Sequence, residues 1–204
     1  MKKLAAVALM VLPLFAEPPD DQRIAANEAA ARSCLRNIVV AQAQFRMMDR
    51  DGNGAADYWV ADVSGLARIK ASKDSKDGIA LIEPTLACAD AKPCVPLDKE
   101  GEFKGGNEPV TLVAAGAAKP KIGYLFQTVA KYQDRDGKWE AYDPGNGRNA
   151  ALYAFCALPA EYGKTGNNTF IISEIGTVWK KDTGGKEPEG MPFDPAKDGW
   201  TEAK

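Results

Sequence analysis

The longest amphipathic pattern in the chain runs from Gln22 to Met48. This segment contains no Gly or Pro and is rich in Ala, Arg, Gln and Met, which favour helices. Its apolar residues recur three, four or seven positions apart: Ile24, Ala31, Leu35, Ile38, Ala41, Phe45 and Met48. The pattern predicts one long amphipathic helix that begins at an Asp20 or Asp21 cap and turns its apolar stripe toward a core.

The middle of the chain, from Trp59 to Gly106, has weaker periodicity. The stretches "VADVSGLARIK" and "GIALIEPTLACADA" predict short helices that end at Gly and Pro residues. The charged stretch "KASKDSKDG" and the Gly-rich "EGEFKGGNEP" predict exposed loops.

Beyond Pro120 the apolar period changes to two, which is typical of strands. Alternate residues of "KIGYLFQTVAKY" share one face, and "AALYAFCALPA" and "NTFIISEIGTVWKK" follow, the last with a turn at residues 174–176. Phe193 and Trp200 are expected to anchor the tail. One helix followed by such a meander predicts a single α+β domain over residues 17–204, with the long N-terminal helix packed on a C-terminal antiparallel sheet.

Residues 1–16 form a different kind of segment. Met1, Lys2 and Lys3 precede the apolar run "LAAVALMVLPLFA", which ends at a small residue before "EPPDD". This pattern predicts a secretory signal peptide and an exported protein, periplasmic or extracellular. The run is shorter than the roughly 20 residues of a membrane-spanning helix, and no later segment is apolar enough, so we expect no membrane span after cleavage.

The composition of the chain limits the partners and the kinds of catalysis that can be expected. The formal net charge is −2 without a concentrated Lys/Arg stripe, which argues against nucleic acid as a partner. The chain contains no His, which excludes Ser-His-Asp and Cys-His catalysis and His-ligated metals. Any catalysis would depend on carboxylates, Lys, Tyr or Cys.

The four cysteines favour disulfides over zinc, because their number is even and the chain is predicted to be exported. Three pairings are possible. Cys88 and Cys94 would close a small loop around Pro93, which leaves Cys34 to join Cys156. We therefore predict that the mature chain has no free thiol.

The stretch "DRDGNGAAD" resembles a calcium loop in its spacing. Its candidate ligands are Asp49, Asp51, Asn53, the carbonyl of Ala55, and Asp57. The twelfth position, where an EF-hand places a bidentate Glu, is Val60, so Asp62 or a distant carboxylate would have to substitute. The alternative is a hydrated turn that ends the helix. Calcium is the one cofactor that the sequence suggests.

Three other groups of residues are weaker candidates. "DRDGKWEAYDPGNGRN" repeats the D-x-D-G start but has Lys138 at the next ligand position, so a hairpin turn is the better interpretation, although Asp134 or Asp136 could support the first loop. Glu161, Tyr162 and Lys164 could in principle exchange protons, but connector loops of this composition are usually structural. The aromatic residues could form a platform for sugars or belong to the core: Trp59, Trp139, Trp179, Trp200, Tyr132, Tyr142 and Tyr153.

Two longer stretches resemble known families. "NEAAARSCLRNIVVAQAQFRMMDRDGNGAADYW" is similar to the helix and following loop of secreted pilin-like bacterial proteins, and the overall layout resembles type IV pilins and type II secretion pseudopilins. "YAFCALPAEYGKTGNNTFIISEIGTVWKKDTG" resembles an uncharacterised secreted family with the pattern A-Y-P-A-E-Y-G-x-S-G-x-x-T-F. These resemblances imply export and a pilin-like α+β fold.

One departure from the pilins bears on function. A filament-forming pilin keeps an apolar N-terminal half-helix, whereas the predicted helix here is polar and rich in Ala. We therefore expect a protein that does not build a pilus but acts without catalysis through surface contacts with an envelope or extracellular protein. The alternatives are a secreted carboxylate-dependent hydrolase and a carbohydrate-binding module.

Overall fold

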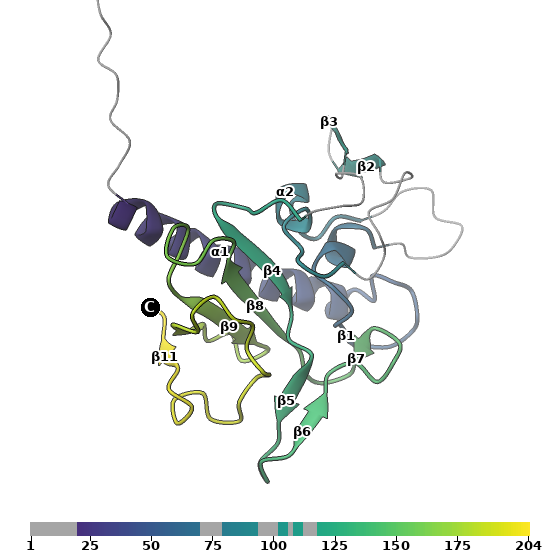
Figure 1. Cartoon of the computed structure of the whole chain (residues 1–204). Helices are drawn as coiled ribbons and strands as arrows, with labels where there is room; N and C mark the ends of the chain where they lie inside the picture. The colour runs from purple at the N-terminus through teal and green to yellow at the C-terminus, as the bar shows by residue number, and fades with distance from the viewer. Residues whose placement is uncertain (1–19, 70–78, 94–101, 106–107, 112–117) are drawn as a thin grey trace, which may run out of the picture.

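The computed structural model describes residues 20–69, 79–93, 102–105, 108–111 and 118–204 (Figure 1). The predicted signal peptide, the predicted "KASKDSKDG" loop and Cys94 lie outside this part of the chain. Among the helices that are described, none is both long and apolar enough to cross a membrane.

Helix α1 (Asp20–Met47) confirms the predicted amphipathic helix. Asp20 and Asp21 lie in its first turn and Arg46 in its last, where their charges interact favourably with the helix dipole. One stripe of the helix is buried: Ala31, Cys34, Leu35, Ile38, Ala41, Gln42 and Phe45. The helix contacts strands β8 (Ala154–Pro159) and β9 (Thr169–Ser173), so it covers one face of a sheet.

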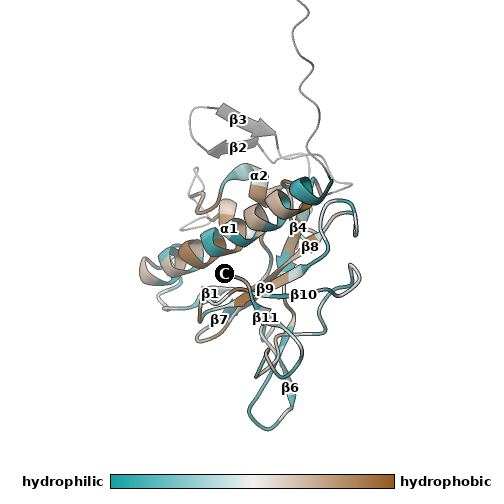
Figure 2. Ribbon diagram, turned by 90° about the vertical axis from the view of Figure 1, so that its left-hand side faces the viewer, coloured by the Kyte–Doolittle hydropathy of each residue, from teal (hydrophilic) through white to brown (hydrophobic). Residues whose placement is uncertain are grey.

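The main sheet contains five antiparallel strands. Their spatial order is β11 (Thr201–Glu202), β10 (Trp179–Lys181), β9, β8 and β4 (Tyr124–Thr128). The predicted turn after β9 contains Gly176 at φ 82°, a conformation that side-chain-bearing residues rarely adopt. Helix and sheet together confirm the predicted α+β class. Figure 2 shows α1 running along one side of this sheet.

Both faces of the main sheet are buried, which explains why the whole of β8 is apolar and inaccessible. Phe155 and Phe170 belong to the cluster that packs against α1. Cys156 and Ile171 alternate with them and belong to a second cluster on the opposite face. The second cluster includes Met191 and Trp200 of the C-terminal segment, so that segment takes the place of a second helix layer.

The predicted disulfide between Cys34 and Cys156 is wrong. Both residues carry free, buried thiols, and Cys88 is also free. Cys34 belongs to the cluster beside α1 and Cys156 to the cluster on the other face, so the sheet lies between the two sulfurs. The second residue of the predicted Cys88 to Cys94 pair lies outside the described residues.

Shorter elements surround the main sheet. They are β1 (Tyr58–Trp59) paired with β7 (Arg148–Asn149), β2 (Glu102–Gly105) with β3 (Glu108–Thr111), β5 (Lys131–Gln133) with β6 (Trp139–Ala141), the 3-10 turn η1 (Ser64–Ala67) and the helix α2 (Pro84–Ala87). The two short helices were predicted, whereas β2 and β3 fall in a predicted loop. The single strand expected over residues 121–132 is divided between β4 and β5.

Candidate functional site

The loop that follows α1 is a tight turn organised by Asp49. Asp49 itself adopts φ 43°, and Gly52 and Gly54 adopt 65° and 79°. Asp49 Oδ1 accepts a hydrogen bond from the backbone N–H of Asn53 over 3.1 Å, and Oδ2 accepts one from Gly54 over 3.0 Å. Asp49 therefore closes the turn and brings the other polar side chains of the loop together.

Arg148 and Asn53 supply the donors that face the remaining carboxylates of this loop. Arg148 Nε donates to Asp51 Oδ2 over 2.7 Å. Asn53 Nδ2 lies 3.0 Å from Asp51 Oδ2 and 3.2 Å from Asp57 Oδ2, while Asn53 Oδ1 accepts the Ala55 N–H. The second oxygens of the two carboxylates, Asp51 Oδ1 and Asp57 Oδ1, are buried without a hydrogen-bond partner.

The predicted calcium ligands thus meet in one loop, but they are held by protein donors. No group of three or more His, Cys, Asp or Glu in the described ranges is arranged to hold a metal ion. Asp62, considered as a substitute for the missing twelfth ligand, accepts hydrogen bonds from Gly65 N over 2.7 Å and Trp59 Nε1 over 3.1 Å. The calcium site stays a prediction.

The second D-x-D-G segment forms the tip of the β5–β6 hairpin, as its sequence predicts. Asp134 Oδ1 accepts the backbone N–H groups of Asp136 and Lys138 over 2.9 and 2.8 Å. This geometry makes Asp134 a turn residue. The side chain from this part of the chain that reaches the first loop is Arg148 instead.

The connector between β8 and β9 is a structural element rather than an acid-base site. Lys164 pairs with Glu161 over 2.8 Å, and Tyr162 donates to Asp182 over 3.0 Å, all at exposed positions. The Lys164 hydrogen bond lowers the pKa of Glu161, and the Asp182 hydrogen bond raises the pKa of Tyr162. Both shifts favour the ordinary charge states at neutral pH, so neither group is prepared for proton transfer.

The same connector is tied to the N-terminal helix. Glu28 accepts hydrogen bonds from the backbone N–H groups of Asn167 and Asn168 over 3.0 and 3.1 Å, and from Asn168 Nδ2. A Cβ on Gly166 would lie 2.0 Å from the Tyr124 hydroxyl, so glycine permits this close approach. These contacts give a packing reason for the Y-G-x-[ST]-G pattern.

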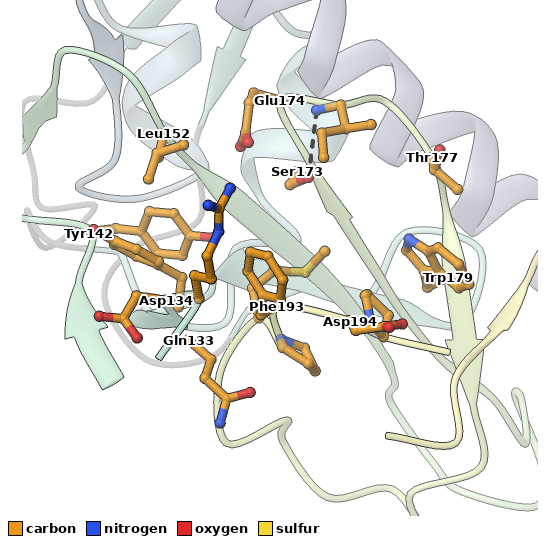
Figure 3. Close-up of a pocket in the computed structure, with 16 residues that line it drawn as sticks. Gln133, Asp134, Tyr142, Leu152, Ser173, Glu174, Thr177, Trp179, Phe193 and Asp194 are labelled. Atoms are coloured by element: carbon orange, nitrogen blue, oxygen red, sulfur yellow. Dashed lines mark hydrogen bonds between the residues drawn. The ribbon is translucent and has the colours of Figure 1, made fainter. Parts of the chain in front are cut away.

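A cavity of about 490 Å³ opens on the second face of the main sheet, the face opposite α1 (Figure 3). Its volume falls within the range of small-molecule sites. Tyr132 and Tyr142 line it from the hairpin side, Trp179 from β10, and Met191 and Phe193 from the C-terminal segment. Tyr142 and Met191 belong to the second core cluster, and Tyr132 and Trp179 pack against it, so the cavity borders this cluster.

Backbone pairing fixes the C-terminal wall of the cavity. Met191 N donates to Lys131 O over 2.8 Å, and Gln133 N donates to Met191 O over 2.9 Å. A Cβ on Gly190 would lie 2.4 Å from the Trp139 ring and 2.7 Å from Lys131 O. Glycine at this position therefore lets the C-terminal segment lie against the hairpin.

Charged side chains line the cavity on several sides: Asp134, Glu174, Asp194 and Arg135. Asp194 pairs with Lys197 over 3.0 Å, and this hydrogen bond lowers the pKa of Asp194. Asp134 is engaged by the backbone of its turn, as described above. The lowered pKa stabilises the ionised form of Asp194.

Glu174 stands at the β9–β10 turn with fewer partners. Its Oε2 accepts one long hydrogen bond, 3.4 Å, from Tyr153 N. Burial first, and then the Glu174 charge, raise the pKa of Tyr142 above its usual range, so this phenol stays neutral. The Glu174 charge thus acts on Tyr142. Together with Tyr132 and Trp179, Tyr142 forms what we call the aromatic floor of the cavity.

Comparison with known proteins assigns the chain to a family. Residues 20–202 match the family described as "Protein of unknown function (DUF2950)", which covers nearly the whole described fold. The chain belongs to this family. No curated protein and no solved structure matches it.

In this DUF2950 chain, sequence reasoning found part of the cavity. Of the seven aromatic residues considered as a platform, the cavity brings together Tyr132, Tyr142 and Trp179. The sequence did not indicate Ile175 and Phe193 as lining residues. Their side chains line the cavity with exposed fractions of 78% and 58%. Phe193 and Trp200 were expected to anchor the tail; Trp200 is buried there, whereas Phe193 is exposed. The signal that could have indicated an exposed Phe193 is its position between two prolines in "MPFDP".

Proposed function

We propose that this chain is an exported, non-enzymatic protein of the envelope or extracellular space that acts by binding, and that the cavity on the second sheet face is its contact site. The observation that carries the proposal is a cavity of about 490 Å³ with an aromatic floor and exposed apolar side chains at Ile175 and Phe193. Exposed apolar groups around a concave site are typical of recognition surfaces. In this proposal, the cavity binds a chemical group that belongs to an envelope or extracellular partner.

The carboxylates of the cavity favour binding over the hydrolase alternative. Glycoside hydrolysis by a carboxylate pair needs one carboxyl held protonated and a second held ionised. Asp194 is stabilised as an anion by Lys197, and Asp134 accepts two backbone hydrogen bonds within its own turn. Glu174 would have to act alone, which is not the arrangement such chemistry uses.

The pilin-like layout is part of the same proposal. It is supported by one helix of 28 residues that crosses an antiparallel sheet and contacts β8 and β9. The buried stripe of α1 faces this chain's own sheet, which suits a subunit that stands alone rather than in a filament. An experimental structure superposed on a pseudopilin would test it: the same strand order and helix crossing would support the proposal, and a different order would refute it.

We also propose weak calcium binding at the loop after α1. The support is the pair of buried oxygens without a partner, Asp51 Oδ1 and Asp57 Oδ1, because buried carboxylate oxygens normally find a donor or a cation. A calcium ion would compete with Arg148 for Asp51. We therefore expect affinity no tighter than that of extracellular calcium modules, roughly 10⁻⁴ to 10⁻³ M.

The binding proposal is tested by thermal melts in the presence of four separate ligand classes: neutral sugars, organic cations, organic anions and neutral apolar alcohols. The matched variant is Thr177→Trp, which places a large ring at the cavity wall. We expect at least one class to raise the melting temperature of the native chain and not that of Thr177→Trp. No shift with any class, or equal shifts in both proteins, would refute binding in the cavity.

A further inference from the structure

We propose that the ligand of the cavity is an organic cation that carries its positive charge on an apolar body, such as a quaternary ammonium group. This inference rests on the proposed function, because it assumes that the cavity is a binding site. It adds the chemical class of the ligand, which follows from the charges and the rings that line the cavity.

The charge balance of the lining favours a cation. Three carboxylates face one guanidinium: Asp134, Glu174 and Asp194 against Arg135. The lining residues therefore carry a formal charge of −2, and Lys197, which pairs with Asp194 over 3.0 Å, reduces the balance around the cavity to −1. An anionic ligand would meet net repulsion in a site partly shielded from water, where charge interactions are stronger than in bulk solvent.

Glu174 is the carboxylate best placed to meet the ligand. Asp134 and Asp194 already have short partners, whereas Glu174 accepts one long hydrogen bond, of 3.4 Å, from Tyr153 N. Glu174 and Tyr142 both line the cavity (Figure 3), and the Glu174 charge contributes to the raised pKa of Tyr142. The Glu174 carboxylate therefore makes the electrostatic potential beside the aromatic floor more negative, which favours a cation there.

The aromatic residues add a second attraction for positive charge. The rings of Tyr132 and Tyr142 are 4.9 Å apart between centroids and tilted by 44°, and Trp179 and Phe193 face the same cavity. The electron-rich faces of such rings attract a cation within about 6 Å. This attraction adds to that of the carboxylates.

The apolar part of the lining selects against a sugar. Leu152, Ile175, Met191 and the prolines that flank Phe193 present no hydrogen-bonding side chain. Gln133, Ser173 and Thr177 also line the cavity, but a sugar hydroxyl placed against the apolar groups would lose its hydrogen bonds to water, which is unfavourable. The alkyl substituents of a quaternary ammonium group have no such requirement, so they suit the same surface.

Isothermal titration calorimetry with choline and with 3,3-dimethylbutan-1-ol tests the inference, because the alcohol has the same shape without the charge. We expect choline to bind about tenfold more tightly than the alcohol, the size expected from a carboxylate and a few ring contacts. Raising the salt concentration should weaken choline binding and leave that of the alcohol unchanged. Free choline tests the cationic group alone, whatever molecule carries it in the cell.

Two matched variants locate the effect. Glu174→Gln should weaken choline binding by about tenfold, while Glu161→Gln, at an exposed site outside the cavity lining, should leave it unchanged. Equal affinity for choline and its neutral isostere, or an unaltered affinity in Glu174→Gln, would overturn the cationic ligand. If sugars or alcohols still stabilise the native chain but not Thr177→Trp, the cavity is a binding site for another class, and only this inference fails.

Discussion

Arg148 and Asp51, 97 positions apart in the chain, are joined by a hydrogen bond of 2.7 Å from Nε to Oδ2. Both side chains are largely buried, with exposed fractions of 18% and 11%. The guanidinium carbon of Arg148 also lies 4.1 Å from the centroid of the Trp59 ring. One side chain thus neutralises the Asp51 carboxylate of the loop after α1 and fastens strand β7 to that loop.

Substitution of Arg148 should therefore destabilise the fold. Arg148→Gln removes a charged hydrogen bond and a ring contact, and it leaves the buried Asp51 carboxylate without its cation. We expect the free energy of unfolding to fall by about 2 kcal/mol, measured by guanidinium denaturation. Arg36→Gln, at an exposed position of α1, should change it by less than about 0.5 kcal/mol. Equal effects of the two variants would contradict a stabilising role for Arg148.

Arg148→Gln also tests whether calcium can replace Arg148 as the cation that pairs with the carboxylates of this loop. At about 10 mM calcium and a Kd of about 1 mM, the native chain should gain about 1.4 kcal/mol relative to EDTA. The gain should be larger in Arg148→Gln, where the competing guanidinium is absent, and should vanish in Asp57→Asn. Melting temperatures unaffected by calcium in both the native chain and Arg148→Gln would leave the loop as a plain turn.

Asp90 should make stability depend on pH between about 4 and 6. Burial raises the pKa of Asp90 from 3.8 to about 6, even though backbone N–H groups of Val63, Ser64 and Lys92 donate to it. Between these values the folded state binds more protons than the unfolded state, so this contribution is fully present below about pH 4 and is lost as pH rises through 6.

The measurement is denaturation at several pH values for the native chain and for Asp90→Asn. The rise in the Asp90 pKa from 3.8 to about 6 corresponds to about 3 kcal/mol. As the pH rises through this range, the native chain should lose about this much more stability than the variant loses. Subtracting the variant removes the contribution of other titrating groups. Parallel curves for the two proteins would refute a raised pKa at Asp90.

Gly190→Ala should loosen the wall of the cavity. Its Cβ would collide with the Trp139 ring and with Lys131 O, so the C-terminal segment would have to move away from the hairpin. We expect faster hydrogen exchange at the Met191 and Gln133 amides, and a loss of stability of about 1–3 kcal/mol. Glu189→Ala removes only an exposed ion pair to Lys131 and serves as the control. Unchanged exchange at both amides in Gly190→Ala would contradict the close packing.

The cysteines should titrate as thiols. Cys34 and Cys156 are free and buried, and burial raises the pKa of each thiol above its usual range. The native protein should therefore react slowly with a thiol reagent, because the reactive thiolate is scarce and inaccessible. The unreduced, denatured chain should expose at least two reactive thiols. Fewer than two would mean that a disulfide involves one of these residues.

The parts of the fold that depend on local pattern were predictable. Helix α1 follows from the spacing of Leu35, Ile38 and Phe45, and the turn after β9 follows from Gly176. Both depend on residues a few positions apart, where helical and strand periods act directly.

Features that depend on which face a strand presents were not predictable. The Cys34 to Cys156 pairing failed because β8 is buried on both faces, so its apolar run does not reveal that Cys156 points away from α1. The calcium pattern could not reveal Arg148, which reaches the loop through the pairing of β1 with β7. The cavity combines residues from three segments, and Phe193 was misplaced because its exposure depends on that assembly.

The most direct test of the binding cavity is a choline titration followed by the indole N–H signals of the four tryptophans in a ¹⁵N-labelled native chain. Trp179 lines the cavity, whereas Trp59, Trp139 and Trp200 do not, so the chain carries its own internal controls. We predict a saturable shift of the Trp179 signal, with the Trp59 signal unchanged. A Trp179 signal that does not move, or that moves no more than that of Trp59, would contradict binding in this cavity.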